Sequence, residues 1–328
     1  MKRRDFMKLM AGTAGAAVAA SLVAGAGSAL AECADGGLDY SAADYGRMRK
    51  FMPLKQGRIA YIDKGAGPAA LFLHGFPLSN YQWRGAIARL KAYRRCLAPD
   101  SMGLGFTEVA EGQGVAPADQ VEMLAAFLDT LGVDSVDLVA NDSGGAVAQL
   151  FVLKYPARVR TLLLTNCDVE PDSPPPALVP VIELARKGTF PDEWLMPWNA
   201  DHNLARSSEG LAGLCYSKPG HPTDDALDLY LAPLVSSAAR KGLTNAYTLG
   251  LDPNPLAGIE AGLRALDTPV RVVWGTADDI FSSDSPGYLD RVFKNSKGVR
   301  EVPGAKLFFP EEYPDLIADE AKVLWGVA

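Results

Sequence analysis

The sequence predicts an α/β fold in which a mostly parallel eight-stranded sheet carries an inserted helical cap. Two observations favour this fold class. Short apolar segments alternate with helical segments before about residue 167, and the alternation resumes after about residue 267. Between these positions there are helical stretches and no clear strand. We therefore expect a core formed by residues 32–167 and 267–328 and a cap formed by residues 168–266, which suits a chain of 328 residues.

The predicted strands are short apolar segments, and the first two are expected to form an antiparallel pair at one edge of the sheet. These strands are 47–54, 58–63, 69–73, 95–98, 135–139, 159–164, 270–274 and 299–302. Core helices are predicted over 81–93, 118–131, 146–155, 287–293 and 312–325. Cap helices are predicted over 178–186, 223–234 and 241–250. Residues 32–45 are expected to be a loose lead-in.

The first 31 residues have the features of an export signal. Arg3 and Arg4 precede a long run of Ala, Gly, Val and Leu, and small residues lead to Ala31. The twin arginine resembles a Tat signal, so we expect the twin-arginine export machinery as a partner and the periplasm as the destination. The mature chain is expected to begin near Glu32, without a stable membrane anchor.

Composition excludes several classes of function. A formal net charge of −7 gives no basic surface for nucleic acid. The four cysteines are scattered and show no spacing typical of metal ligands, so neither a metal nor a cofactor is expected. Hydrophobic content of 48% and charged content of 22% are those of an ordinary globular protein.

Residues 138–146, Leu-Val-Ala-Asn-Asp-Ser-Gly-Gly-Ala, are predicted to form a nucleophile elbow between a strand and a helix. Small residues are needed there because the backbone doubles back on itself. Ala140 and Gly144 flank Asp142 in the required frame, which favours Asp142 as the nucleophile. Ser143 fits this frame less well, and as the nucleophile it would make the protein a serine esterase. A simple helix cap is a further alternative, but it does not explain the glycine pair.

Several motifs in the same order resemble those of the α/β-hydrolase superfamily from about residue 46 to the C-terminus, and most closely its haloalkane dehalogenase and epoxide hydrolase branch. The motifs are His-Gly-Phe-Pro at 74–77, Tyr-Gln-Trp-Arg at 81–84, Arg-Cys-Leu-Ala-Pro-Asp at 95–100 with Gly-Leu-Gly at 103–105, the elbow, and Val-Trp-Gly-Thr-Ala-Asp at 273–278. Their common order favours the fold more strongly than any one activity.

The resemblance implies a role for several residues. Asp142 would attack an electrophilic carbon of an alkyl halide or epoxide and form a covalent alkyl ester. The backbone N–H groups of Phe76 and Ser143 would form the oxyanion hole. Asp278 lies where the family keeps the carboxylate that orients the base, and Asp168 is the alternative position. The substrate is expected to be a small and largely apolar molecule.

One position departs from the family pattern. Leu307 stands where relatives carry the catalytic histidine that activates water. A substitute base is one explanation, and the candidates are His202, His221, Lys306 and Asp278. The chemistry could instead stop at, or not need, the ester. A third explanation is a catalytically silent relative that binds a small molecule in the pocket.

The pocket candidates are His74, Trp194, Trp198 and Tyr216. His74 in this motif usually supports the oxyanion loop, and the two tryptophans are expected to line or close the pocket. Ser143 follows the nucleophile where dehalogenases usually have a halide-binding Trp, and Phe76 matches the epoxide hydrolase form. Epoxide hydrolases use two cap tyrosines, for which the candidates are Tyr216, Tyr230 and Tyr247.

Overall fold

A computed structural model of the protein describes residues 39–328. The expected signal peptide and the processing site near Glu32 lie outside this range. Within it, no helix combines the length and apolar character that crossing a bilayer requires.

The core is a twisted sheet whose central strands are parallel. Its eight-strand path runs β1-β2-β4-β3-β6-β7-β8-β9. Only the β1–β2 and β2–β4 pairs on this path are antiparallel. The strands are β1 (Lys50–Leu54), β2 (Gly57–Lys64), β3 (Ala69–Leu73), β4 (Arg95–Pro99), β6 (Val136–Asp142), β7 (Val159–Cys167), β8 (Val270–Gly275) and β9 (Ser296–Val302). The predicted fold class is confirmed, with the addition of β5 (Glu108–Val109), a ninth strand that pairs with β2.

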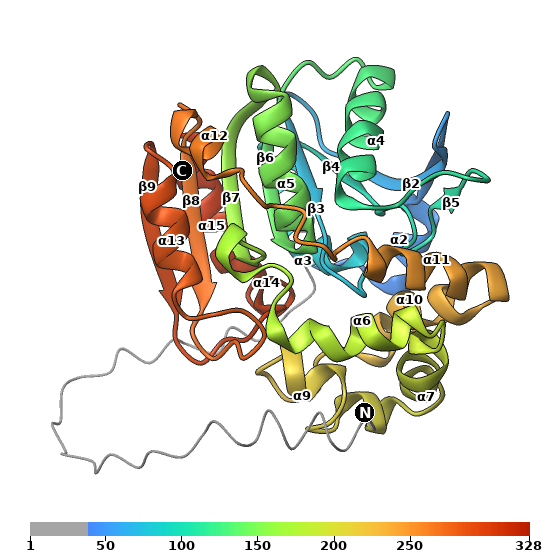
Figure 1. Ribbon diagram of the computed structural model, residues 1–328. Coiled ribbons are helices and arrows are strands. Elements are labelled where there is room, and N and C mark those ends of the chain that lie inside the picture. Colours follow the sequence, from blue (N-terminus) through green and yellow to red (C-terminus); the bar gives the residue numbers. More distant parts are fainter. Residues whose placement is uncertain (1–38) are drawn as a thin grey trace, which may run out of the picture.

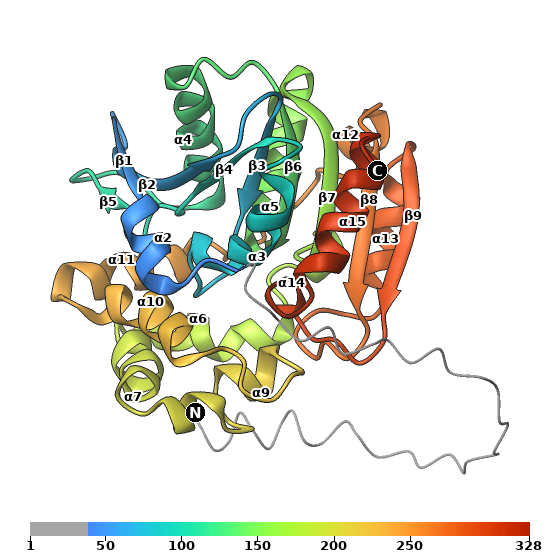
Figure 2. The same cartoon turned by 180° about the vertical axis from the view of Figure 1, so that it is seen from behind.

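Helices cover both faces of the sheet. The pair α4 (Pro117–Thr130) and α5 (Ser143–Lys154) covers the face in front in Figure 1. The pair α3 (Arg84–Leu90) and α15 (Pro314–Trp325) covers the opposite face, which Figure 2 shows in front. Every residue of β3 and β6 is buried, as expected for strands covered on both sides.

Between β7 and β8 the chain forms helices and turns. The helices are α6 (Val179–Arg186), α7 (Met196–Ala200), α8 (His202–Arg206), α9 (Leu211–Cys215), α10 (Asp224–Val235), α11 (Ala238–Leu249) and α12 (Glu260–Ala265). Figure 1 shows α6, α7, α9, α10 and α11 gathered beyond the carboxyl ends of the strands, toward which the arrowheads of β8 and β9 point. Ligands of parallel sheets bind at that edge.

Some expected boundaries were wrong. The lead-in and the start of the first predicted strand contain α2 (Ala42–Met48). Ser41 caps this helix, because its hydroxyl accepts a hydrogen bond from Asp44 N. The helix predicted over 81–93 begins as a 3₁₀ turn and becomes α-helical only in α3. The last predicted helix is split into α14 (Phe309–Glu312) and α15, which begins at Pro314. The three five-residue helices α7, α8 and α9 were not predicted, because one helical turn shows no periodicity.

Candidate active site

Asp142 lies at the turn between β6 and α5. Its φ of 56° is the only positive φ of a non-glycine residue within 39–328. This backbone conformation costs free energy that the surrounding structure must offset, and such strain is typical of functional positions. A Cβ at Gly144 would lie 2.6 Å from His74 O, so only glycine permits this close approach of helix and strand. The structure thus has the geometry of a nucleophile elbow.

One carboxylate oxygen of Asp142 is held by the loop after β3. Phe76 N donates a hydrogen bond of 2.7 Å to Asp142 Oδ1. Gly75 permits this contact, since a Cβ there would lie 2.7 Å from the Asp142 Cβ. Ser143 also hydrogen-bonds Asp142 through its backbone and its side chain. The two residues predicted to form the oxyanion hole therefore both contact the predicted nucleophile.

Two amide side chains connect this loop to the elbow and to the loop that carries Leu307. Gln82 accepts a hydrogen bond from Gly75 N (3.0 Å) and donates one to Asn141 Oδ1 (2.6 Å). Asn141 Nδ2 donates in turn to the carbonyl oxygen of Leu307 (3.1 Å). Because all of these groups are buried, losing one would leave the others unpaired at a cost of about 1–3 kcal/mol each.

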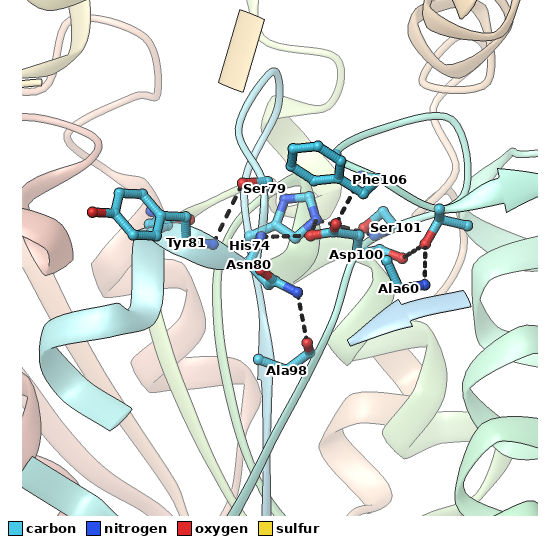
Figure 3. Close-up of polar contacts among 12 residues, drawn as sticks. Ala60, His74, Ser79, Asn80, Tyr81, Ala98, Asp100, Ser101 and Phe106 are labelled. Atoms are coloured by element: carbon cyan, nitrogen blue, oxygen red, sulfur yellow. Dashed lines mark hydrogen bonds and ion pairs between the residues drawn. The ribbon is translucent and has the colours of Figure 1, made fainter. Parts of the chain in front are cut away.

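His74 supports the loop and does not line the site. Its Nε2 accepts a hydrogen bond from Ser101 N (3.0 Å), so the ring proton is on Nδ1, which lies 2.9 Å from Gly75 O (Figure 3). Burial lowers the pKa of His74, which keeps the ring neutral in spite of the nearby Asp100 carboxylate. Asp100 itself accepts hydrogen bonds from Asn80 N and Phe106 N (both 2.8 Å). Placing His74 in the pocket was therefore wrong.

A largely apolar cavity lies over Asp142. Its volume, including its opening to solvent, is about 710 Å³. Its walls include both predicted tryptophans, Trp194 and Trp198, together with aromatic and aliphatic side chains of the cap and core. The apolar walls that sequence reasoning missed include Phe190, Leu211, Leu214, Leu251 and Phe281. No local motif marks them, because four of them reach the cavity through the packing of the cap and Phe281 reaches it from the loop after β8.

The buried Asp142 carboxyl can still ionise near neutral pH. Burial raises the pKa of Asp142 to about 6, and the hydrogen bonds from Phe76 and Ser143 limit the increase. Above that pH the carboxylate predominates, and a desolvated carboxylate is a stronger nucleophile than a hydrated one.

The two candidates for the second acid lie in different surroundings. Asp278 follows β8 but does not line the cavity. Its oxygens accept hydrogen bonds from Asn166 Nδ2 (2.7 Å) and Ile280 N (2.9 Å). Asp168 follows β7, lines the cavity and accepts a hydrogen bond from the Ser173 hydroxyl (2.8 Å). Burial raises the pKa of each carboxyl to about 7.

Leu307 is buried in the cavity wall, and the expected substitute bases lie elsewhere. His202 pairs with Asp224 (2.9 Å) and Asp228 (3.2 Å). Lys306 Nζ donates to Gly213 O (2.5 Å), and His221 stacks on Tyr216. Among the described residues that line the cavity, the only titratable ones are Asp142, Asp168 and Cys215. Burial raises the pKa of the Cys215 thiol well above its ordinary value, so the thiol is neutral.

The cap tyrosines do not line the cavity either. Tyr216 and Tyr230 both donate to Glu311 Oε2, at 2.7 and 3.0 Å, so the placement of Tyr216 in the pocket was wrong. The Tyr247 hydroxyl lies 3.0 Å from Ser143 Oγ, and its ring stacks on Phe76. Tyr247 therefore supports Phe76 and Ser143 from the cap side.

Comparisons with known proteins agree with this geometry. A family model described as the alpha/beta hydrolase fold matches residues 68–313. Haloalkane dehalogenase 2 of Mycobacterium tuberculosis (strain ATCC 25618 / H37Rv) is 27% identical over 279 residues, which cover 80% of this chain and 90% of that protein. Epoxide hydrolase 2 of Siraitia grosvenorii is 42% identical over 101 residues, 30% of this chain and 32% of that protein.

Solved structures show the same fold. A haloalkane dehalogenase from Bradyrhizobium elkani matches with a TM-score of 0.69 at 22% identity, covering 85% of this chain and 98% of that one. The chain belongs to the α/β-hydrolase fold family, whose model spans most of its length. Within that family it is a hydrolase related to haloalkane dehalogenases and epoxide hydrolases.

Proposed function

We propose that the protein hydrolyses a small, largely apolar alkyl halide or epoxide through nucleophilic attack by Asp142. The observation that carries this proposal is the position of Asp142. It occupies the strained elbow, faces an apolar cavity and has one oxygen held by Phe76 N–H. The second oxygen is then available to attack carbon, and the product is an alkyl ester of Asp142.

The same donors serve the second step. When water attacks the ester carbonyl, negative charge develops on the oxygen that Phe76 N–H already contacts. A preorganised donor at this position is typically worth a factor of about 100 to 1,000 in rate. The aromatic and aliphatic walls favour an uncharged substrate, because no cationic side chain lines the described cavity.

The test is incubation with 1-bromohexane and with styrene oxide, followed by intact-mass measurement, peptide mapping and product analysis. We expect an adduct on Asp142, steady product release, or both. Asp142→Asn keeps an acceptor for Phe76 N–H but should reduce the alkylation rate by about 10,000-fold or more. In H₂¹⁸O, a single turnover should place ¹⁸O in the Asp142 carboxyl.

Two other results would favour the alternatives. A serine esterase would hydrolyse p-nitrophenyl acetate and lose that activity in Ser143→Ala but not in Asp142→Asn. A silent binding protein would form no adduct with either probe and would bind apolar ligands equally well after Asp142→Ala.

We also propose that the twin-arginine machinery exports the protein to the periplasm. The paired Arg3 and Arg4 ahead of an apolar run support this proposal. N-terminal sequencing of the periplasmic protein should give a start near Glu32, and the double substitution Arg3→Lys and Arg4→Lys should retain the precursor in the cytoplasm.

A further inference from the structure

The cavity lacks a histidine at its family position, but it contains a second carboxyl beside the nucleophile. Asp142 on β6 lies opposite Cys167 on the neighbouring parallel strand β7. Asp168 is the next residue after Cys167, so it lies just beyond Asp142 at the same edge of the sheet. Neighbouring strands lie about 4.8 Å apart. Both aspartates line the same cavity, and Asp168 is only 3% exposed.

Asp168 is held firmly in this position. Gln149 Nε2 donates to its backbone carbonyl (2.7 Å), and the Ser173 hydroxyl donates to Oδ1 (2.8 Å). Gln149 belongs to α5, the helix that begins at the elbow, so the nucleophile and Asp168 are positioned by one rigid unit.

We propose that Asp168 carries out the proton transfers of this site and that the substrate is an epoxide. Protonated Asp168 donates its proton to the epoxide oxygen as Asp142 opens the ring, and the resulting carboxylate then takes a proton from the water that hydrolyses the ester. This inference rests on the proposed function, because it requires the ester of Asp142.

The two steps balance. In the first, the ring C–O bond breaks, an Asp142 O–C bond forms, and the Asp168 proton moves to the ring oxygen. In the second, water adds to the ester carbonyl while Asp168 takes one of its protons. The tetrahedral intermediate then expels the alkoxide, which takes the proton of the added hydroxyl. Asp142 is again a carboxylate, Asp168 is again protonated, and one diol is released.

The charges around Asp168 suit both roles. Burial raises its pKa to about 7, with repulsion from Asp142 as the second cause, so near neutral pH a large fraction carries a proton. Esterification removes the charge of Asp142, which lowers the pKa of Asp168 when a base is needed. Asp172 also raises this pKa, and Ser173 lowers it. Cys167 and Tyr247 face the same pair and have raised pKa values, so both are neutral.

An epoxide fits this cavity better than a halide. A departing halide needs N–H donors and no proton, and Ser143 stands where dehalogenases usually have the halide-binding tryptophan. An epoxide oxygen needs a proton, which the cap tyrosines cannot supply from their places outside the cavity. Tyr216 and Tyr230 donate to Glu311, and Tyr247 contacts Ser143. The acids that remain in the cavity are Asp168 and the Cys215 thiol, and burial raises the pKa of the thiol so far that Asp168 is the stronger acid.

The test compares the unmodified protein with Asp168→Asn, using styrene oxide and 1-bromohexane as probes. With styrene oxide, Asp168→Asn should alkylate more slowly and release diol about 100-fold or more slowly, so that the ester accumulates on Asp142. Alkylation by 1-bromohexane needs no proton, so Asp168→Asn should slow it much less than it slows alkylation by styrene oxide. Asp168→Glu should recover part of the diol release.

Two further variants separate a proton-transfer role from a structural one. Asp172→Asn removes a nearby carboxylate that does not line the cavity but raises the pKa of Asp168, so the alkaline limit of alkylation by styrene oxide should move to lower pH while the maximal rate of diol release stays within about twofold. Ser173→Ala removes a donor that favours ionised Asp168, so the pH at which alkylation by styrene oxide is half lost on the alkaline side should rise.

Three outcomes would contradict this inference. In the first, Asp168→Asn releases diol as fast as the unmodified protein. In the second, the unmodified protein itself stops at the ester, which would leave the nucleophilic role of Asp142 standing. In the third, no adduct or product forms with either probe in any variant, which would overturn the proposed function as well.

Discussion

The nucleophile half of the site, residues 74–82 and 138–146, and the base half, residues 303–313, are held in place by different parts of the molecule. Gln82 and Phe76 connect the nucleophile half within the core. The base half is tied mainly to the cap. Phe308 N donates to the carbonyl of Cys215 (2.9 Å), and Lys306 Nζ donates to that of Gly213 (2.5 Å).

Because of this difference, alkylation of Asp142 and hydrolysis of the ester depend on different parts of the molecule. Under the proposed function, alkylation requires the elbow and the loop 74–82, which are held mainly by contacts within the core, with further contacts from the cap residues Tyr247 and Phe190. The base half supplies the apolar Leu307 to the cavity wall and makes several contacts with the cap. Under the proposed proton transfer, Asp168, which follows β7 and lines the same cavity as Asp142, supplies the base, so none is required at position 307.

The largest expected effect comes from breaking the connection between base half and cap at Glu311. Its carboxylate accepts hydrogen bonds from Arg84 (2.8 Å), Tyr216 and Tyr230 in a buried cluster. Glu311→Ala leaves the buried Arg84 charge without its partner, which should lower the free energy of unfolding by about 3–5 kcal/mol in urea titrations.

The matched control is Glu320→Ala. Glu320 pairs with Arg271 at 2.7 Å, but this pair is partly exposed, so the cost should be about 1 kcal/mol or less. At temperatures where Glu311→Ala remains folded, alkylation of Asp142 by 1-bromohexane should persist. Equal costs for the two variants would show that Glu311 does not hold the cap.

A smaller effect is expected from returning a base to the base half. In an Asp168→Asn background, Leu307→His should increase diol release by about 100-fold, since an imidazole can then take the proton from water. Burial of the imidazole should cost about 1–3 kcal/mol of stability. Single-turnover measurements with styrene oxide test the gain.

Leu307→Gln is the control, because it is polar but cannot act as a base. Adding Asp278→Asn should cancel the gain if Asp278 orients the new imidazole. An equal gain from glutamine would mean that polarity, and not proton transfer, limits the step.

The nucleophile half was predictable from sequence because its signals are local. The strand, the small residues and the helix around Asp142 lie within about 20 residues, and the structure places Phe76 and Ser143 against Asp142. For the base half, the sequence did not predict which side chains contact one another. Tyr216 reaches Glu311 across 95 residues of sequence, so no local pattern reveals that its hydroxyl points away from the cavity.

The choice between Asp168 and Asp278 was open for a related reason. Both follow strands that end at the same edge of the sheet. Which side chain faces the cavity depends on the turn that follows each strand. Ser173 holds one carboxyl, whereas Asn166 and Ile280 N hold the other outside the cavity.

The smallest expected effect is a difference in pH dependence between the two probes. Alkylation needs ionised Asp142, and burial raises the pKa of this carboxyl to about 6. With 1-bromohexane the rate should therefore be half-maximal near pH 6, fall about tenfold per pH unit below it, and reach a plateau above it.

With styrene oxide the rate should fall again above about pH 7, because protonated Asp168 is also required. Between pH 6 and 7 the two profiles should differ by only about twofold, so measurements to pH 9 are needed. A plateau with both probes would remove proton donation by Asp168 and leave Asp142 as the one residue whose ionisation controls the attack.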